Sequence, residues 1–200
     1  MSVGDTEITV CNLAVSWLGG NSIESEADDD ELPATLTTEG ILCNANYDTC
    51  RNQTLEARNW TFATARGTLT PSVVDPAFGY TYAFTITAGW LRLIDVDSDV
   101  SFTQREHWVR EEDRILCDFT PAYVMYIATI TDPVEFSAHF VDALASRIAA
   151  NIALPLTGSK DLEKLMEAKY INALETGGAM DGLQGKNLDM HPRNKLILAR

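Results

Sequence analysis

The strongest helix signal in the chain lies at residues 132–155, which read DPVEFSAHFVDALASRIAANIALP. Asp132 is a natural N-cap, Pro133 suits the first position of a helix, and Glu135 completes a capping box. Every fourth side chain that follows is apolar: Phe136, Phe140, Leu144, Ile148 and Ile152. We therefore predict a helix that begins at Asp132, ends near Pro155 and, through its many alanines, packs closely against other helices.

Three further helices are predicted around this one. One begins after Ser159 and ends at Gly177-Gly178, because glycine favours the end of a helix. The other two occupy residues 5–18, ended by Gly19-Gly20, and residues 33–59, which start with a proline. The second of these carries a seam of modest side chains, suited to helix packing, at alternating steps of four and three: Leu36, Gly40, Cys43, Tyr47, Cys50 and Thr54.

Between residues 61 and 131 the period of the apolar side chains falls to two, which is typical of strands. From Tyr80 to Thr87, aromatic or aliphatic side chains alternate with Thr or Ala, as in a half-buried strand. A hairpin is expected where two short apolar runs flank Glu111-Glu112-Asp113. The remaining expected strands are Trp90–Val96 and Val124–Ile130.

These elements predict a mainly α-helical protein with a β insertion, an α+β fold. Residues 1–60 and 132–182 each supply a helix pair, and the N- and C-terminal pairs are expected to close into a four-helix bundle. Residues 61–131 are expected to form a small antiparallel β-domain between the pairs. Residues 183–200 lack amphipathic order and are expected to form an extended C-terminal tail.

The charge of the chain limits its partners. Its 200 residues hold 29 Asp and Glu against 15 Lys and Arg, a formal net charge of −14. Such a chain is repelled by phosphate, which argues against a general nucleic-acid binder and against an anionic membrane surface. No run of apolar residues is long enough for a membrane span, and the N-terminus lacks the basic start of a signal peptide.

The charge is also unevenly distributed along the chain. Residues 1–33 hold eight acids and no Lys or Arg, and four of the acids are consecutive: Asp28, Asp29, Asp30 and Glu31. Residues 183–200 hold one acid against four basic residues: Lys186, Arg193, Lys195 and Arg200. The two ends are therefore expected to face different surroundings, although a single charge run is more often only solvated.

The sequence contains no recognisable enzyme motif. The three histidines, His107, His139 and His191, share no metal-ligand spacing with one another or with the four cysteines. The cysteines lie in apolar stretches, and we expect them to be buried free thiols. No nucleotide-binding loop and no nucleophile motif is present. We therefore expect no cofactor, no metal and no catalytic residue.

One chemical alternative stays open, because paired carboxylates can cleave glycosides and 29 acids offer many chance pairs. The β insertion offers Asp95 with Asp97, and the run Glu111, Glu112 and Asp113. Such acids are more often solvated turn residues. Four aromatic side chains in the insertion could bind sugars: Tyr80, Tyr82, Trp90 and Trp108. Aromatic residues at strand spacing are more often part of a hydrophobic core.

Four features recur together along the chain. The first helix ends in Leu18-Gly19-Gly20 before an acidic loop, and the second runs into Arg58-Asn59-Trp60-Thr61-Phe62-Ala63. The β insertion holds Trp90-Leu91-Arg92-Leu93 and then Tyr126 to Asp132, and the final helix pair ends in Gly177-Gly178-Ala179-Met180-Asp181-Gly182. In this order the features resemble the tail tubular protein A family of short-tailed phages, also called the head-to-tail adaptor or gatekeeper family. The resemblance covers residues 5–182.

The resemblance implies a structural virion protein of the phage tail, made in the host cytoplasm, and not an enzyme. Members form a ring, typically of twelve copies, that joins the portal to the tail nozzle. The nozzle is formed by a protein similar to tail tubular protein B. The ring surrounds double-stranded DNA in transit without binding it specifically. The acidic run at residues 28–31 is then a candidate to face the channel. The tail is the candidate to bind the portal, through Lys186, Arg193, Lys195, Leu196, Ile197, Leu198 and Arg200.

The sequence leaves two alternative functions open besides the adaptor. One is a virion-associated protein that binds or hydrolyses glycans with carboxylates of the β-domain. Release of sugar from cell-wall or capsular polysaccharide would reveal the hydrolysis. The other is a cytoplasmic helical interaction module unrelated to phage. The position of the gene beside portal and capsid genes would separate the adaptor from this last alternative.

Overall fold

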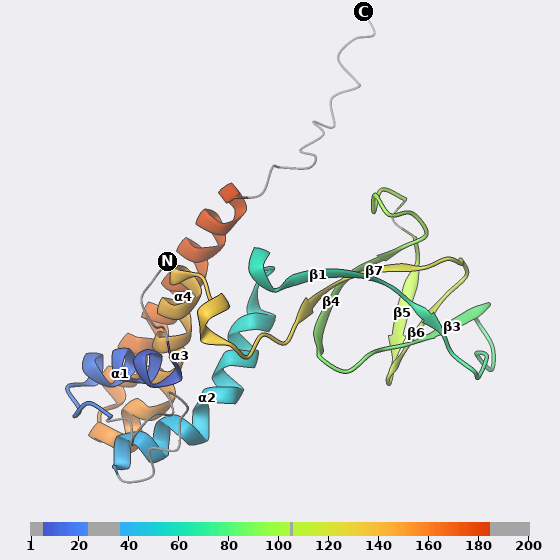
Figure 1. The fold of residues 1–200 in the computed structure, drawn as a ribbon. Helices are drawn as coiled ribbons and strands as arrows, with labels where there is room; N and C mark the ends of the chain where they lie inside the picture. The colour runs from blue at the N-terminus through green and yellow to red at the C-terminus, as the bar shows by residue number, and fades with distance from the viewer. Residues whose placement is uncertain (1–5, 24–36, 105, 185–200) are drawn as a thin grey trace, which may run out of the picture.

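The computed structural model describes residues 6–23, 37–104 and 106–184 (Figure 1). Two helices precede the strands, α1 (Glu7–Leu18) and α2 (Thr38–Ala57), and two follow them, α3 (Ala138–Thr157) and α4 (Lys160–Gln184). Figure 1 shows the helices gathered on one side of the molecule and the strands on the other. The predicted α+β fold is confirmed.

The predicted four-helix bundle is wrong. α3 is a central helix that contacts α1, α2 and α4, whereas α1 and α2 contact each other much less and α4 packs mainly on α3. The physical reason lies in α3 itself, which is apolar on nearly all sides and not along one stripe. Its buried residues include Phe140, Val141, Ala143, Leu144, Ala145, Ile148, Ala149 and Ile152. A helix of this kind needs cover from several directions.

By length and composition alone, α3 is also apolar enough to cross a membrane, and it is the one described helix with this property. The core helix of a globular protein has the same character. Here α1, α2 and α4 pack on α3, and most of its surface is buried.

The start of α3 corrects the prediction from the capping motif. The carboxylate of Asp132 accepts a hydrogen bond from the Val134 amide at 2.9 Å, but the turn that it caps is the short 3₁₀ helix η2 (Pro133–Glu135). The N-cap of α3 lies five residues later than predicted, at Ser137, whose Oγ accepts from the Phe140 amide at 3.3 Å. The local motif therefore predicted a real cap but assigned it to the wrong helix.

The other helix boundaries agree in part. α1 ends at Gly19, as predicted, in the left-handed conformation with φ of 73°. α2 begins at Thr38 with Thr37 as its cap; the predicted proline start lies outside the described residues. The predicted seam of α2 is buried at its five described positions, from Gly40 to Thr54. α4 begins after Ser159 as predicted, but it continues through Gly177-Gly178 to Gln184.

The strands of the β insertion form two antiparallel sheets. The three-stranded sheet has the order β1-β7-β4, with bounds Thr64–Thr68, Tyr123–Ala128 and Trp90–Asp97. The four-stranded sheet has the order β2-β3-β6-β5, with bounds Thr70–Pro71, Tyr82–Thr85, Arg114–Cys117 and Trp108–Glu111. A second hydrophobic core lies here, formed by Leu69, Phe84, Val96, Ile115, Cys117, Ala122 and Val124.

The predicted hairpin around Glu111-Glu112-Asp113 is confirmed as β5 and β6, in which Trp108 pairs with Cys117. The strand expected from Tyr80 to Thr87 is shorter, and its burial does not alternate. Ala83 and Phe84 are both buried, whereas Tyr82 is 37% exposed. β3 lies between β2 and β6, so its burial follows its neighbours in the sheet more than its own pattern.

Candidate functional site

The helices and the strands are joined around Trp60, which lies between α2 and the short 3₁₀ helix η1 (Thr61–Ala63). Trp60 is fully buried, and its indole Nε1 donates a hydrogen bond to the Thr54 carbonyl at 2.8 Å. Its ring meets Phe140 of α3 edge-on, with centroids 5.2 Å apart, and Phe62 lies 6.3 Å away. An aromatic cluster therefore connects the end of α2 to the central helix.

Gly177 explains why α4 does not end where the glycines predicted. A Cβ atom at this position would lie 3.0 Å from the Trp60 ring and 3.3 Å from the Cβ of His139. The neighbouring Gly178 approaches the Arg58 guanidinium in the same way. These glycines allow a continuous helix to cross closely over Trp60, so their role is in packing and not in termination.

A third contact ties the three-stranded sheet to this point. Arg92 of β4 donates a hydrogen bond to the side-chain oxygen of Asn59, which precedes Trp60. Leu91 and Ile94 of the same strand pack against the helical core, and Ile127 of β7 is buried within it. We call Arg58, Asn59, Trp60, Arg92, Gly177 and Gly178 the junction.

Replacing Gly177 with alanine should destabilise the protein by about 1–2 kcal/mol, although alanine is the better helix former. The added methyl group meets a fully buried ring that is held by the Thr54 hydrogen bond and cannot move aside. The matched control is Gly178→Ala, which meets the end of the flexible Arg58 side chain. Urea unfolding should rank Gly178→Ala as the more stable variant, and the reverse order would contradict this account of the junction.

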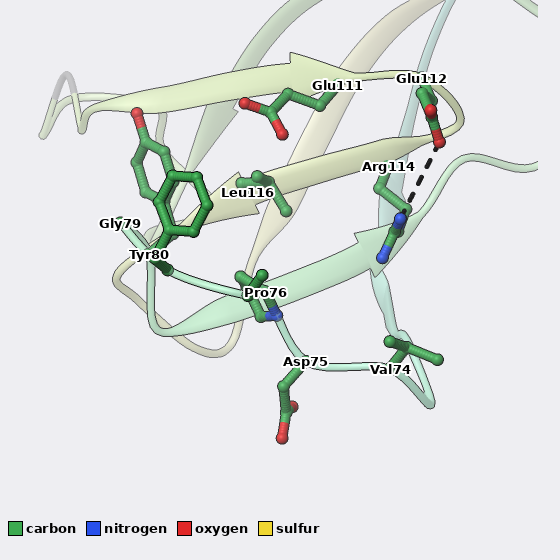
Figure 2. A pocket seen from close by; sticks show the side chains of 11 residues that line it. Val74, Asp75, Pro76, Gly79, Tyr80, Glu111, Glu112, Arg114 and Leu116 are labelled. Atoms are coloured by element: carbon green, nitrogen blue, oxygen red, sulfur yellow. Dashed lines mark ion pairs between the residues drawn. The ribbon is translucent and has the colours of Figure 1, made fainter.

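A pocket of about 410 Å³ lies between the β5–β6 hairpin and the loop that leads into β3 (Figure 2). Eleven residues line it: Val74, Asp75, Pro76, Ala77, Phe78, Gly79, Tyr80, Glu111, Glu112, Arg114 and Leu116. We call it the acidic pocket, since three of its lining side chains are carboxylates and one is basic. Figure 2 shows Glu111 and Glu112 on the hairpin and Asp75 on the loop opposite.

The carboxylates of the acidic pocket outnumber its one basic side chain, Arg114, which lies opposite Glu111 in the hairpin. Arg114 pairs with Glu112 at 3.9 Å and with Asp113, just outside the pocket, at 3.8 Å. Among the residues that the structure describes, Asp75 and Glu111 form no ion pair. Tyr80 stacks on His107 with ring centroids 5.9 Å apart, so one of its faces is already covered. The pocket therefore has a net negative charge beside apolar surface.

The structure separates the two carboxylate groups that the sequence offered for glycan chemistry. Glu111 and Glu112 line the acidic pocket with Asp113 beside them. Asp95 and Asp97 are not a surface pair, so that alternative is wrong, and Asp97 is not the solvated turn residue that was favoured over it. Asp97 is fully buried and accepts hydrogen bonds from the backbone amides of Asp99 at 2.9 Å and Gln104 at 3.0 Å. Asp95 accepts one from the indole of Trp108 at 3.3 Å.

A second cavity, of about 300 Å³, lies beside the loop that Asp97 holds. Its lining includes Phe102, whose φ of 54° is unusual for a bulky side chain, and Arg66, whose guanidinium carbon lies 5.4 Å from the Phe102 ring centre. This arrangement could not be predicted from the sequence, because it depends on the buried contacts of Asp97. An aspartate run in a turn looks the same whether it is solvated or internal.

The remaining predicted site residues have separate outcomes. The channel-facing candidates Asp28, Asp29, Asp30 and Glu31 lie outside the described residues. So do the portal-binding candidates Lys186, Arg193, Lys195, Leu196, Ile197, Leu198 and Arg200. None of the four aromatic residues expected in the core is fully buried: Tyr80, Trp90 and Trp108 are partly buried, and Tyr82 is exposed.

The four cysteines are buried free thiols, as predicted. Cys50 accepts a hydrogen bond from the Asn151 amide at 3.3 Å, and burial away from water raises the pKa of its thiol to about 11. Hydrogen bonding to Cys43, together with burial, raises the pKa of Cys11 in the same direction. Burial also raises the pKa of Tyr47, whose buried hydroxyl has no hydrogen-bond partner. These groups therefore stay neutral and serve packing at ordinary pH.

The folded protein should lose stability at high pH for this reason. The Cys50 pKa rises from an ordinary value of 9.0 to about 11 on folding. The neutral thiol stabilises the fold fully below pH ~9, and this contribution is lost as the pH rises towards 11. Urea unfolding in the presence of a reductant, at about pH 8 and about pH 10.5, should show the decline. Cys50→Ala should reduce the difference between the two measurements, and an equal difference in both proteins would contradict the assignment.

Within the described ranges, no group of three or more His, Cys, Asp or Glu residues is arranged to hold a metal ion. The two features that stand out are the junction, which is built from packing, and the acidic pocket, which is built from charge. Comparison of the chain with protein-family models and with curated proteins gives no match in either case.

Proposed function

We propose that this chain is a structural virion protein, a head-to-tail adaptor that forms a ring between the portal and the tail nozzle around the DNA channel. The observation that carries the proposal is the junction. Three of the four sequence features behind the resemblance contact each other there: Asn59 with Arg92, and Trp60 with Gly177. Residues that carry the resemblance, although distant in sequence, thus contact one another at the junction.

Packing at the junction also suits the mechanical role. An adaptor must hold its contact surfaces at a constant angle while DNA under pressure passes through the ring. A buried tryptophan against a glycine, with a hydrogen bond from β4 to the end of α2, restricts movement between the helices and the three-stranded sheet. The junction therefore supports a rigid subunit in preference to two loosely linked parts.

The charge supports the same proposal. A conduit should not retain DNA, because Lys and Arg contacts to phosphate would hold and slow it. Twelve copies at −14 each would carry −168. A ring with part of that charge towards its channel repels the DNA backbone and lets it move.

Electron microscopy of the purified chain mixed with the portal protein of the same genome tests the proposal. We expect a coaxial ring on one end of the portal, with twelvefold symmetry in end-on class averages. The portal alone and the chain alone are the controls. Portal particles that stay undecorated at a saturating concentration of the chain would exclude the adaptor role.

The acidic pocket favours a second candidate, a glycan-binding or glycan-hydrolysing virion protein. Glu111 and Glu112 lie in one cavity with the half-buried ring of Tyr80, which is the composition of a sugar site. Incubation with cell-wall and capsular polysaccharides should then release sugar, and Glu111→Gln should abolish the release. Glu56→Gln, on the exposed surface of α2, is the control. No release by the wild-type chain removes hydrolysis from consideration.

A further inference from the structure

The acidic pocket lies next to a concentration of exposed apolar side chains. The loop between β2 and β3 exposes Val73 completely, Phe78 at 88% and Val74 at 62%. Two of these three line the pocket. Large apolar side chains that are fully exposed and clustered are typical of an interaction surface. The pocket thus combines a contact area for apolar side chains with a net negative charge, from Asp75, Glu111 and Glu112 against Arg114. Glu111 lies opposite Arg114 in the hairpin without an ion pair, and Figure 2 shows Asp75 at the outer edge of the loop, directed away from the hairpin.

The partner that fits this surface is a short segment with basic ends and an apolar centre. Residues 193–200 of this chain read RNKLILAR and have this composition, with Leu196-Ile197-Leu198 between basic residues on both sides. They belong to the 16 residues that follow α4, which can span at most about 53–58 Å. Charge complementarity therefore points to the chain's own C-terminal segment as the occupant.

We propose that the acidic pocket binds residues 193–200 of a second copy of this chain. Figure 1 shows the four-stranded sheet on the side of the molecule away from α4, which favours the tail of a neighbour over that of the same copy. Such a contact joins two different surfaces, and repeated contacts of that kind close into a ring when the rotation allows it. The proposal assigns the tail to a partner other than the portal and does not rest on the adaptor function.

A binding titration tests the pocket. The receptor is the full chain with Arg193→Glu and Lys195→Glu, so that its own tail does not compete, and the probe is a fluorescent peptide of residues 185–200. Saturable binding should appear in fluorescence anisotropy and should weaken when salt is raised from about 0.05 M to about 0.5 M. Adding Asp75→Lys and Glu111→Lys to the receptor should weaken binding about tenfold or more. Glu56→Lys with Glu175→Lys changes the net charge equally at exposed helix positions and should leave binding unchanged.

Mixing two full-length variants tests whether the tail comes from another copy. One carries the reversed pocket, Asp75→Lys with Glu111→Lys, and the other carries the reversed tail, Arg193→Glu with Lys195→Glu. Each alone places like charges together and should sediment as a monomer. In the mixture each tail finds a complementary pocket, so larger species should form.

The outcomes separate this proposal from the adaptor function. A mixture that stays monomeric while the peptide binds means that tails do not join two copies through the pocket, which overturns the proposal. The proposal is also overturned if Asp75→Lys with Glu111→Lys leaves the affinity for the peptide unchanged. If Arg193→Glu with Lys195→Glu abolishes portal decoration, and the peptide binds the reversed pocket as well as the wild-type pocket, then the tail binds the portal. The adaptor function would survive each of these results.

Discussion

Replacing Trp60 with alanine should lower the free energy of unfolding by about 3–5 kcal/mol, which is a large part of the stability of an ordinary domain. The ring is fully buried against Phe140 and close to Gly177 of α4, so its removal leaves a cavity inside the protein. The Thr54 carbonyl also loses its hydrogen bond from the indole. Urea unfolding followed by circular dichroism measures the change.

Two controls separate the junction from general loss of an aromatic ring. Trp90→Ala removes a half-buried ring that stacks on Tyr126 with centroids 4.3 Å apart, and it should cost clearly less. Trp60→Phe keeps most of the apolar contact but loses the hydrogen bond, so it should fall between wild type and Trp60→Ala. The account of the junction is wrong if Trp90→Ala destabilises the protein as much as Trp60→Ala. Under the adaptor proposal, Trp60→Phe should also reduce portal decoration.

Replacing Asp97 with alanine should cost about 2–4 kcal/mol, since two backbone amides lose a charged acceptor inside the protein. The carboxylate is fully buried at the end of β4, and it accepts from the amides of Asp99 and Gln104. The loop between those amides carries Phe102 in its left-handed conformation. Hydrogen exchange at the Asp99 and Gln104 amides should therefore accelerate more than exchange in the helices.

The matched variants for this prediction are Asp97→Asn and Asp99→Ala. Asparagine has the same shape and keeps one accepting oxygen, so it should recover part of the stability. Asp99 accepts from the hydroxyl of Ser101 at an exposed contact, so its removal should have a smaller effect. Wild-type exchange rates in Asp97→Ala would show that the buried carboxylate does not hold the loop.

Much of the fold could be predicted because it depends on neighbours along the chain. The period of apolar residues predicted the four helices, the hairpin at Glu111-Glu112-Asp113 and the change from helix to strand near residue 61. Gly19 stops α1 through its own backbone freedom, as expected. Where prediction failed, the competing signal was also local: Asp132 caps a turn just before α3, and Gly177-Gly178 resembles a helix end.

The candidate site was less accessible from sequence. Glu111 and Glu112 were named among possible carboxylates, but the loop carrying Asp75 and Phe78, which forms the other wall of the acidic pocket, was not. Nothing in the residues before Tyr80 indicates that they fold back over the hairpin. The burial of Asp97 was missed because its partners are backbone amides, which are the same in every sequence.

The sequence by itself determined the class of the fold, the order of its elements, the burial of its thiols and its strong negative charge. These properties follow from composition and from spacing within single elements. Only the tertiary structure decided that α3 is central, that α4 passes over Trp60 without ending at its glycines, and that Asp95 and Asp97 do not form a surface pair. The reason is that each of these depends on which side chains from distant segments meet in space. From sequence alone Gly177 predicts a helix end, and only its contact with Trp60 in the folded protein shows its role in packing.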